Sequence, residues 1–201
     1  MLVKGGDRRL LQLVDAVTGE AAITAGAHLA CRPGCSPCCV GVFPISQLDA
    51  WRLRQGLAQL QLDDPARAAA VHRRAATAVA VQAQGFPGDG EGTFAGDEAS
   101  EEAFCDRLSA QPCPALDPAT QTCDLYAWRP IACRTFGPPM RIGGEDLAPC
   151  RLCFTGASPA EVERARRELD VAEHEDELTE AVERETGRHG LTTIAFALTV
   201  R

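Results

Sequence analysis

Aromatic residues, methionine and long apolar runs are all scarce in this sequence. Phenylalanine, tyrosine and tryptophan together make up 5% of the 201 residues, and there are two methionines. Leucine, alanine and valine must therefore supply most of the hydrophobic core. No apolar run approaches the roughly 18 residues that a membrane-spanning helix needs, so we expect no membrane partner. Hydrophobic residues still make up 45% of the chain and charged residues 24%, which excludes collagen-like, low-complexity and wholly disordered proteins.

Positive charge is also in deficit. Lysine and arginine number 20 against 28 aspartate and glutamate residues, and the formal net charge is −8. Proteins that bind a nucleic-acid backbone or an anionic membrane surface carry an excess of basic residues on one face, so this balance argues against both partners. The N-terminus does not resemble a signal peptide, because Asp15 and Glu20 interrupt its apolar residues. We therefore expect a cytoplasmic protein.

The length indicates one to two domains, and we predict a single domain over residues 1–201 with a cysteine-cluster core at about 31–153. Hydrophobic spacing, capping residues and prolines predict helices over residues 7–30, 46–60, 63–84, 98–109 and 158–185. The last is a long acidic helix with a solvated face. Five glycines predict a mobile loop over residues 85–96. The tail at residues 194–200 alternates like a strand, and a short helix is the alternative.

Residues 111–153 differ from the rest of the chain in composition and in hydrophobic pattern. Prolines and glycines share this stretch with five cysteines, and no helical or strand period persists. A segment with so little regular backbone hydrogen bonding needs another source of stability, and a metal site is the simplest one. The predicted fold class is mainly α, with helices packed around an irregular cysteine-rich metal-binding core and little or no sheet.

Cysteine is the one residue type present in excess, with ten in the chain. In a reducing compartment, dense cysteines indicate metal or redox chemistry more often than structural disulfides. Two pairs have the two-residue spacing that is common in zinc and iron–sulfur sites, and prolines and glycines between the thiols allow tight turns. The candidate metal ligands are Cys31, Cys35, Cys38, Cys39, Cys113, Cys123, Cys133, Cys150 and Cys153.

The number of centres stays open at this point. Adjacent Cys38 and Cys39 can hardly both ligate one small ion without strain, so they could serve two metals or two irons of a cluster, or one could face the core. The alternatives to metal are disulfides, which need export, and a thioredoxin-like exchange site at Cys35 and Cys38, which needs a preceding strand. The remaining cysteine, Cys105, is predicted to lie in the core. The four histidines are scattered, and each is better explained as solvated or packed than as a ligand: His28, His72, His174 and His189.

Two blocks of this sequence resemble the YkgJ-type cysteine-cluster family, whose CxxCxxCC domain is described as chelating zinc or iron. The first block, Cys31 to Cys39, departs from the family pattern in one respect, because three residues rather than two separate Cys31 from Cys35. The second block resembles the family's C-x-x-L followed by C-x-(I/L)-Y-x-x-R-P-x-x-C-R. The C-x-x-L part of this motif begins at Cys113, and the longer part runs from Cys123 to Arg134.

The resemblance implies a ligand set and a choice of functions. The implied ligands are Cys35, Cys38, Cys39, Cys113, Cys123 and Cys133, with Cys31 less closely matched. Arg129 and Arg134 could donate hydrogen bonds to sulfur around the metal, with Tyr126 orienting the turn. In the other interpretation, Arg129 with the following proline only fixes a turn, and Arg134 makes a salt bridge.

We predict a metal-binding protein with an iron–sulfur cluster or zinc, and lean towards a cluster or multinuclear site. A metal-storage module and an S-adenosylmethionine-dependent enzyme similar to the family's flagellin lysine N-methylases are the alternatives, so catalysis stays open.

Overall fold

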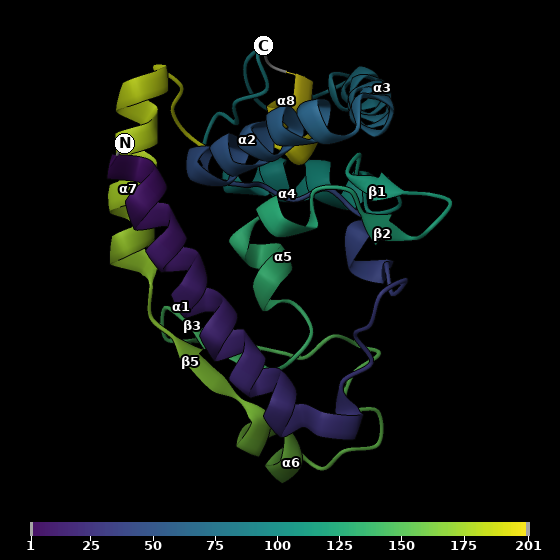
Figure 1. The fold of residues 1–201 in the computed structure, drawn as a ribbon, viewed down its shortest axis with the longest axis vertical. Coiled ribbons are helices and arrows are strands. Elements are labelled where there is room, and N and C mark those ends of the chain that lie inside the picture. Colours follow the sequence, from purple (N-terminus) through teal and green to yellow (C-terminus); the bar gives the residue numbers. More distant parts are fainter. Residues whose placement is uncertain (1, 200–201) are drawn as a thin grey trace. The chain divides into compact units, whose positions relative to one another are not determined.

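The computed structural model describes residues 2–199, except for the side chain of Leu2 (Figure 1). Contacts within the chain divide it into two compact units, which we call unit 1 and unit 2. Unit 1 comprises Met1–Cys35 and Ile131–Ala181, and unit 2 comprises Ser36–Pro130 and Val182–Arg201. The boundary between the units therefore passes through the first cysteine block.

Unit 1 is built on one long helix. The helix α1 (Leu2–Ala25) contacts α5 (Ile131–Thr135), α6 (Pro159–Ala165) and β5 (Arg167–Leu169), and a short 3₁₀ turn, η1 (Gly26–His28), follows it. The strands β4 (Glu145–Leu147), β3 (Met140–Ile142) and β5 form a three-stranded sheet in that order. Leu10 and Val14 on α1 are fully buried, as the predicted helical spacing requires. The predicted helix over residues 7–30 is confirmed, but it begins earlier, at Leu2, and ends earlier, at Ala25.

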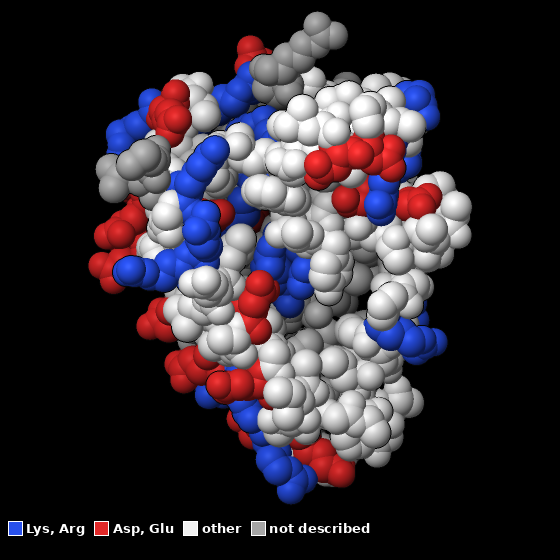
Figure 2. Space-filling view, in the orientation of Figure 1, with Lys and Arg blue, Asp and Glu red and all other residues white. Residues whose placement is uncertain are grey.

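The prediction of one continuous acidic helix over residues 158–185 is wrong, because a strand interrupts it. It begins as expected, because Ser158 and Glu161 form a complete capping box at the start of α6. The chain then turns into β5, which pairs in parallel with β3, before α7 (Ala172–Thr186) begins. Leu169 and Val171 are both buried, and this two-residue alternation is the strand pattern that the surrounding glutamates obscured. Acidic side chains do cover the solvated face of α7, along the left edge of Figure 2.

Unit 2 packs α2 (Gln47–Asp63), α3 (Pro65–Gln82) and α8 (Ile194–Thr199) against one another. Their shared core includes the buried side chains of Leu53, Val71 and Leu198. The predicted start signals are confirmed: the Ser46 side chain accepts a hydrogen bond from the Asp49 N–H, and the Asp64 side chain accepts one from the Arg67 N–H. The tail is helical rather than extended, as the alternative allowed. Val200, the last residue of its predicted alternation, lies outside the described residues.

The remaining elements of unit 2 are short, and three of them carry cysteines. They are η2 (Pro37–Cys39), α4 (Glu98–Arg107), β1 (Leu116–Asp117), β2 (Thr122–Cys123) and η3 (Tyr126–Trp128). The glycine-rich segment at 85–96 is a loop, as predicted. Its Phe86 and Phe94 rings pack with Phe104 of α4, and Cys105 lies against this aromatic cluster.

The mainly α prediction is confirmed, because 56% of the chain is helical and 10% is strand, in two small sheets. The structure does not show the predicted cysteine-rich centre: the buried clusters are apolar, and Cys153 alone of the ten cysteines is fully buried. Among residues 2–199, no helix combines the length and the apolar character needed to cross a membrane.

Gly56 allows η3, which follows Cys123 in the chain, to pack on α2. A Cβ atom at Gly56 would lie 2.4 Å from Cγ of Trp128, a side chain of η3. We expect Gly56→Ala to lower the free energy of unfolding by about 1 to 3 kcal/mol through overpacking. Gly19→Ala in α1, where a Cβ meets nothing within 4 Å, should instead raise it by up to about 1 kcal/mol through helix propensity. Chemical denaturation measures both; equal effects of the two variants would contradict the close packing.

Candidate metal centre

Four thiols of unit 2 are brought together by main-chain hydrogen bonds: Cys38, Cys39, Cys113 and Cys123, which we call the unit-2 thiols. The Cys113 N–H donates to the Cys39 carbonyl oxygen at 2.8 Å. In the β1–β2 pair, Cys123 lies opposite Leu116, three residues after Cys113. Residues that are up to 85 positions apart in sequence thus carry their sulfur atoms into one neighbourhood.

The sulfur atoms of the unit-2 thiols interact with one another. A hydrogen bond from the Cys39 thiol stabilises the Cys38 thiolate, which lowers the pKa of Cys38 to about 6 and raises the pKa of Cys39. Charges at Cys113 and Cys123 also act on Cys39 and raise its pKa. Burial raises the pKa of Cys113 to about 12. The unit-2 thiols are therefore close enough that ionising one disfavours ionising the others, which is the situation that a bound cation relieves.

Hydrogen-bond donors and a cation surround these sulfurs. Backbone N–H groups of Ala115 and Leu116 lower the pKa of Cys113, against the larger effect of burial, and the Leu116 N–H donates to the Cys113 carbonyl oxygen at 3.0 Å. The positive charge of Arg129 acts on both Cys38 and Cys123 and favours their thiolate forms. The Arg129 guanidinium also stacks 3.9 Å from the centre of the exposed Tyr126 ring and donates to the Tyr126 carbonyl oxygen. Arg129 thus acts on two of the candidate ligands, and its contacts with Tyr126 fix its position.

Asp124 joins the two cysteine segments to α3, and sequence analysis missed it. Its side chain is 1% exposed and pairs with both Arg67 and Arg74. Arg74 also donates to the carbonyl oxygen of Pro114, at 2.8 Å. One arginine therefore fixes the residue after Cys113 and the residue after Cys123. The only sequence signal was the position of an aspartate next to a cysteine.

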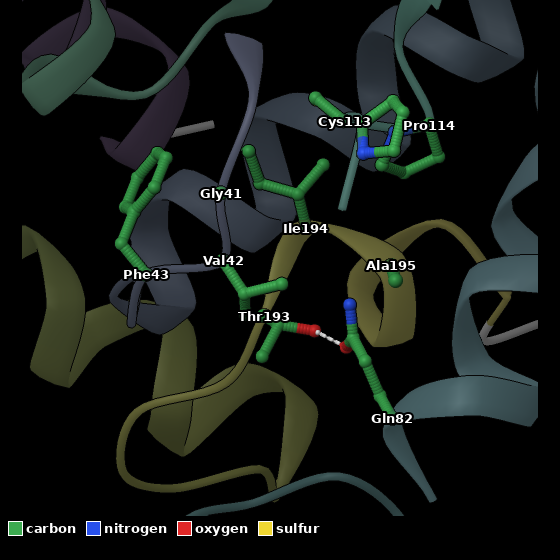
Figure 3. A pocket seen from close by; sticks show the side chains of 10 residues that line it. Gly41, Val42, Phe43, Gln82, Cys113, Pro114, Thr193, Ile194 and Ala195 are labelled. Carbon is green, nitrogen blue, oxygen red and sulfur yellow. Dashed lines mark hydrogen bonds between the residues drawn. The ribbon is translucent and has the colours of Figure 1, made fainter. Parts of the chain in front are cut away.

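A small pocket lies beside Cys113 (Figure 3). Cys113 and Pro114 line it together with residues 41–43 and 193–195. Thr193 and Gln82 face each other across a hydrogen bond of 2.6 Å between Thr193 Oγ1 and Gln82 Oε1. Gln82 Nε2 also donates to Gln111 Oε1, and Thr193 Oγ1 accepts from the Phe196 N–H, so the polar atoms of both side chains have partners within the fold.

Four other thiols come together in unit 1: Cys31, Cys35, Cys150 and Cys153, which we call the unit-1 thiols. The thiols of Cys31 and Cys153 share a hydrogen bond, and charges at Cys35 and Cys150 also act on Cys31. Burial is the main reason that the pKa of Cys31 is raised to about 12. The first cysteine block therefore divides, with two thiols in each unit.

The remaining candidate residues, Cys133, Arg134 and His28, lie in unit 1. Cys133 lies on α5 in unit 1, so the ligands that the resemblance implies are distributed over both units. Arg134 donates two hydrogen bonds to the Asp15 carboxylate, at 2.8 and 3.0 Å, as the salt-bridge interpretation expected. His28 stacks on Phe154 beside Cys153. All ten cysteines are free thiols.

The thiols suit zinc or iron chemically, although their side chains are not yet arranged as ligands. Within the part of the chain that the structure describes, no three or more Cys, His, Asp or Glu side chains are placed to hold a metal ion. Interaction between the sulfurs within each pair, Cys38 with Cys39 and Cys31 with Cys153, shifts their pKa values. Metal binding to cysteine sites releases thiol protons, so ligation here requires deprotonation and a change in the placement of these side chains.

Removing the Asp124 charge should weaken this part of unit 2. We expect Asp124→Asn to lower the free energy of unfolding of the metal-free protein by about 2 kcal/mol, because two charge-assisted hydrogen bonds are weakened. Asp63→Asn is the matched control, since the exposed Asp63 carboxylate pairs with Gln59 at a helix end, and should change stability by less than about 0.5 kcal/mol. Urea denaturation of both variants checks this; equal stabilities would refute the role given to Asp124.

Comparison with known proteins agrees with the cysteine arrangement. No curated protein and no solved structure gave a significant match. A family model named CxxCxxCC, described as "Putative zinc- or iron-chelating domain", matches residues 30–154. This range holds the unit-1 thiols, the unit-2 thiols, Cys105 and Cys133, and it spans more than half of the chain. The chain therefore belongs to the CxxCxxCC family of zinc- or iron-chelating domains.

Proposed function

We propose that the protein binds a thiolate-ligated metal through the unit-2 thiols, with an iron–sulfur cluster favoured over a single zinc ion. The observation that carries the proposal is the hydrogen bond from the Cys113 N–H to the Cys39 carbonyl, which brings the first cysteine block to the second. Membership of a zinc- or iron-chelating family supports metal binding in general.

The adjacent pair Cys38 and Cys39 favours a cluster. Two neighbouring cysteines strain the tetrahedral geometry of one small ion, whereas a cluster offers separate iron atoms to separate sulfurs. The unit-2 thiols supply the four thiolates that such a cluster takes. When bound, the metal would supply either electron transfer or a rigid cross-link between the two cysteine segments.

The chain's own residues adapt this site to negative charge. Each thiol that becomes a ligand gives up its proton, so the site accumulates charge that its surroundings must offset. The positive charge of Arg129 favours the thiolate forms of Cys38 and Cys123, and the backbone N–H groups of Ala115 and Leu116 favour the thiolate form of Cys113. Donors of this kind orient thiolate ligands and tune the metal that they hold.

An S-adenosylmethionine-dependent activity has no comparable support. The glycine-rich loop at 85–96 uses its own carboxylate, since Asp89 Oδ1 accepts hydrogen bonds from the N–H groups of Glu91 and Thr93. Those N–H groups are therefore already satisfied. Catalysis and any protein partner stay open, and calorimetric titration with S-adenosylmethionine would test the first directly.

Serine variants test the ligand set. Cys38→Ser and Cys123→Ser should each reduce the iron content of anaerobically purified protein by at least half and lower its melting temperature, because a ligand of a stabilising site is lost. Cys105→Ser is the control, since Cys105 lies against the aromatic cluster, and its metal content should stay at the wild-type value. Elemental analysis and the visible spectrum provide the measurement; unchanged metal content and melting in both variants would refute the proposal.

A further inference from the structure

We propose that Arg54 of α2 and Arg188, in the segment that follows α7, form a binding site for a doubly charged oxyanion such as a phosphate group. Both residues belong to unit 2, and both lie outside the cysteine blocks. The proposal goes beyond the function above and does not depend on metal binding by the unit-2 thiols.

Hydrogen bonds hold the segment that carries Arg188 against the start of α2. The Ile45 N–H donates to the Thr192 carbonyl oxygen at 2.8 Å, and the Thr192 N–H donates to the Ile45 carbonyl oxygen at 3.0 Å. The Gln47 side chain, in the first turn of α2, donates to the Gly190 carbonyl oxygen at 2.9 Å. The chain between α7 and α8 is therefore fixed to α2 at two successive points.

The two arginines extend from these fixed points towards each other. Arg54 follows Gln47 by seven residues, which is about two helical turns, so both side chains lie on the same face of α2. Arg188 precedes Gly190, the residue that Gln47 holds, by two positions. The positive charges of Arg54 and Arg188 act on each other, as this placement requires. Two guanidinium groups thus share one region of unit 2.

The Arg54 guanidinium has no counter-charge among the residues that the structure describes. Its Nη2 atom is buried, and no side chain or carbonyl oxygen within residues 2–199 accepts a hydrogen bond from it. Burial lowers the pKa of Arg54 and the charge of Arg188 lowers it further, while no described carboxylate acts to raise it. A buried cation without a counter-ion is costly. Arg54 as a whole is half-buried, so solvent reaches part of the side chain and an anion has access.

The carboxylates near Arg188 leave its donors accessible. Glu183 accepts a hydrogen bond from the Gly190 N–H at 2.9 Å and contacts His189 Nδ1 at 3.3 Å. Glu91 lies 3.5 Å from Arg188, but the Glu91 side chain is 76% exposed, and exposed ion pairs contribute little. The Arg188 side chain is itself 33% exposed. Arg188 can therefore exchange this surface pair for a ligand that also contacts Arg54.

The charge of the site favours phosphate over a carboxylate. A guanidinium presents parallel N–H donors that pair with two oxygens of an anion. A phosphate group carries about two negative charges at neutral pH and has enough oxygens for two guanidinium groups, whereas a carboxylate carries one charge. The formal net charge of the chain is −8, so long-range attraction does not assist binding, and the affinity depends on the two arginines.

Thermal unfolding of the wild-type protein tests the site without any variant. Inorganic phosphate, an alkyl phosphate monoester and acetate are each compared with chloride at equal ionic strength. Millimolar phosphate should raise the melting temperature by roughly 2 to 5 °C, and acetate should have less than half of this effect. A larger rise with the monoester would identify a phosphorylated organic molecule as the ligand, and a larger rise with inorganic phosphate would identify the free ion. No rise above chloride, or equal rises with acetate and phosphate, would overturn the proposal.

Arginine variants locate the bound anion. Arg54→Met should abolish the effect of phosphate, and in chloride alone it should raise the melting temperature, because a buried charge without a counter-ion is removed. Arg188→Gln, at a more exposed position, should weaken phosphate binding by roughly tenfold or more. Arg73→Gln is the matched control, since Arg73 is an exposed arginine of α3, and should keep the wild-type affinity. Calorimetric titration measures these affinities; wild-type affinity in both Arg54→Met and Arg188→Gln would overturn the site.

A cysteine variant separates this proposal from the preceding one. Cys38→Ser, which should lose iron, is expected to bind phosphate with the wild-type affinity. Retained iron together with normal phosphate binding would refute the metal site and leave the arginine site intact. Loss of phosphate binding together with iron would place the anion at the metal and overturn the arginine site.

Discussion

The arrangement of thiols in this protein depends on a few main-chain hydrogen bonds between segments that are far apart in sequence. The bond from Cys113 to Cys39 joins the two cysteine blocks in unit 2, and the bond from Phe154 to His28 joins the ends of the cysteine region in unit 1. The first of these bonds brings thiols of both blocks into one neighbourhood, where ionising one thiol disfavours ionising the others. A cation would relieve this repulsion, so the arrangement suits the metal site proposed for the unit-2 thiols.

The two groups of thiols differ in their surroundings. The unit-2 thiols contain an adjacent pair, lie near the Arg129 charge and are tied to α3 through Asp124. The unit-1 thiols contain no adjacent pair, and they have a glycine against one sulfur and a backbone N–H on another. The adjacent pair is the reason that a cluster is proposed for the unit-2 thiols.

Local signals in the sequence predicted much of the fold. Ser46, Asp64 and Ser158 each begin a helix where capping chemistry requires one, and the cysteine spacing together with the motif around Arg129 identified the family. The break in the acidic helix could not be predicted, because β5 forms only by pairing with β3, 27 residues earlier in register. The division of the cysteines between two units, and the part played by Asp124, depend on long-range contacts for which a single sequence carries no periodic signal.

The most direct test of the account is a count of metals and reactive thiols in wild-type protein purified without oxygen and without added metal. The account predicts bound iron, with the unit-2 thiols protected from a thiol reagent until the metal is removed by a chelator. A folded protein that carries no metal, and in which the unit-2 thiols react freely, would contradict it.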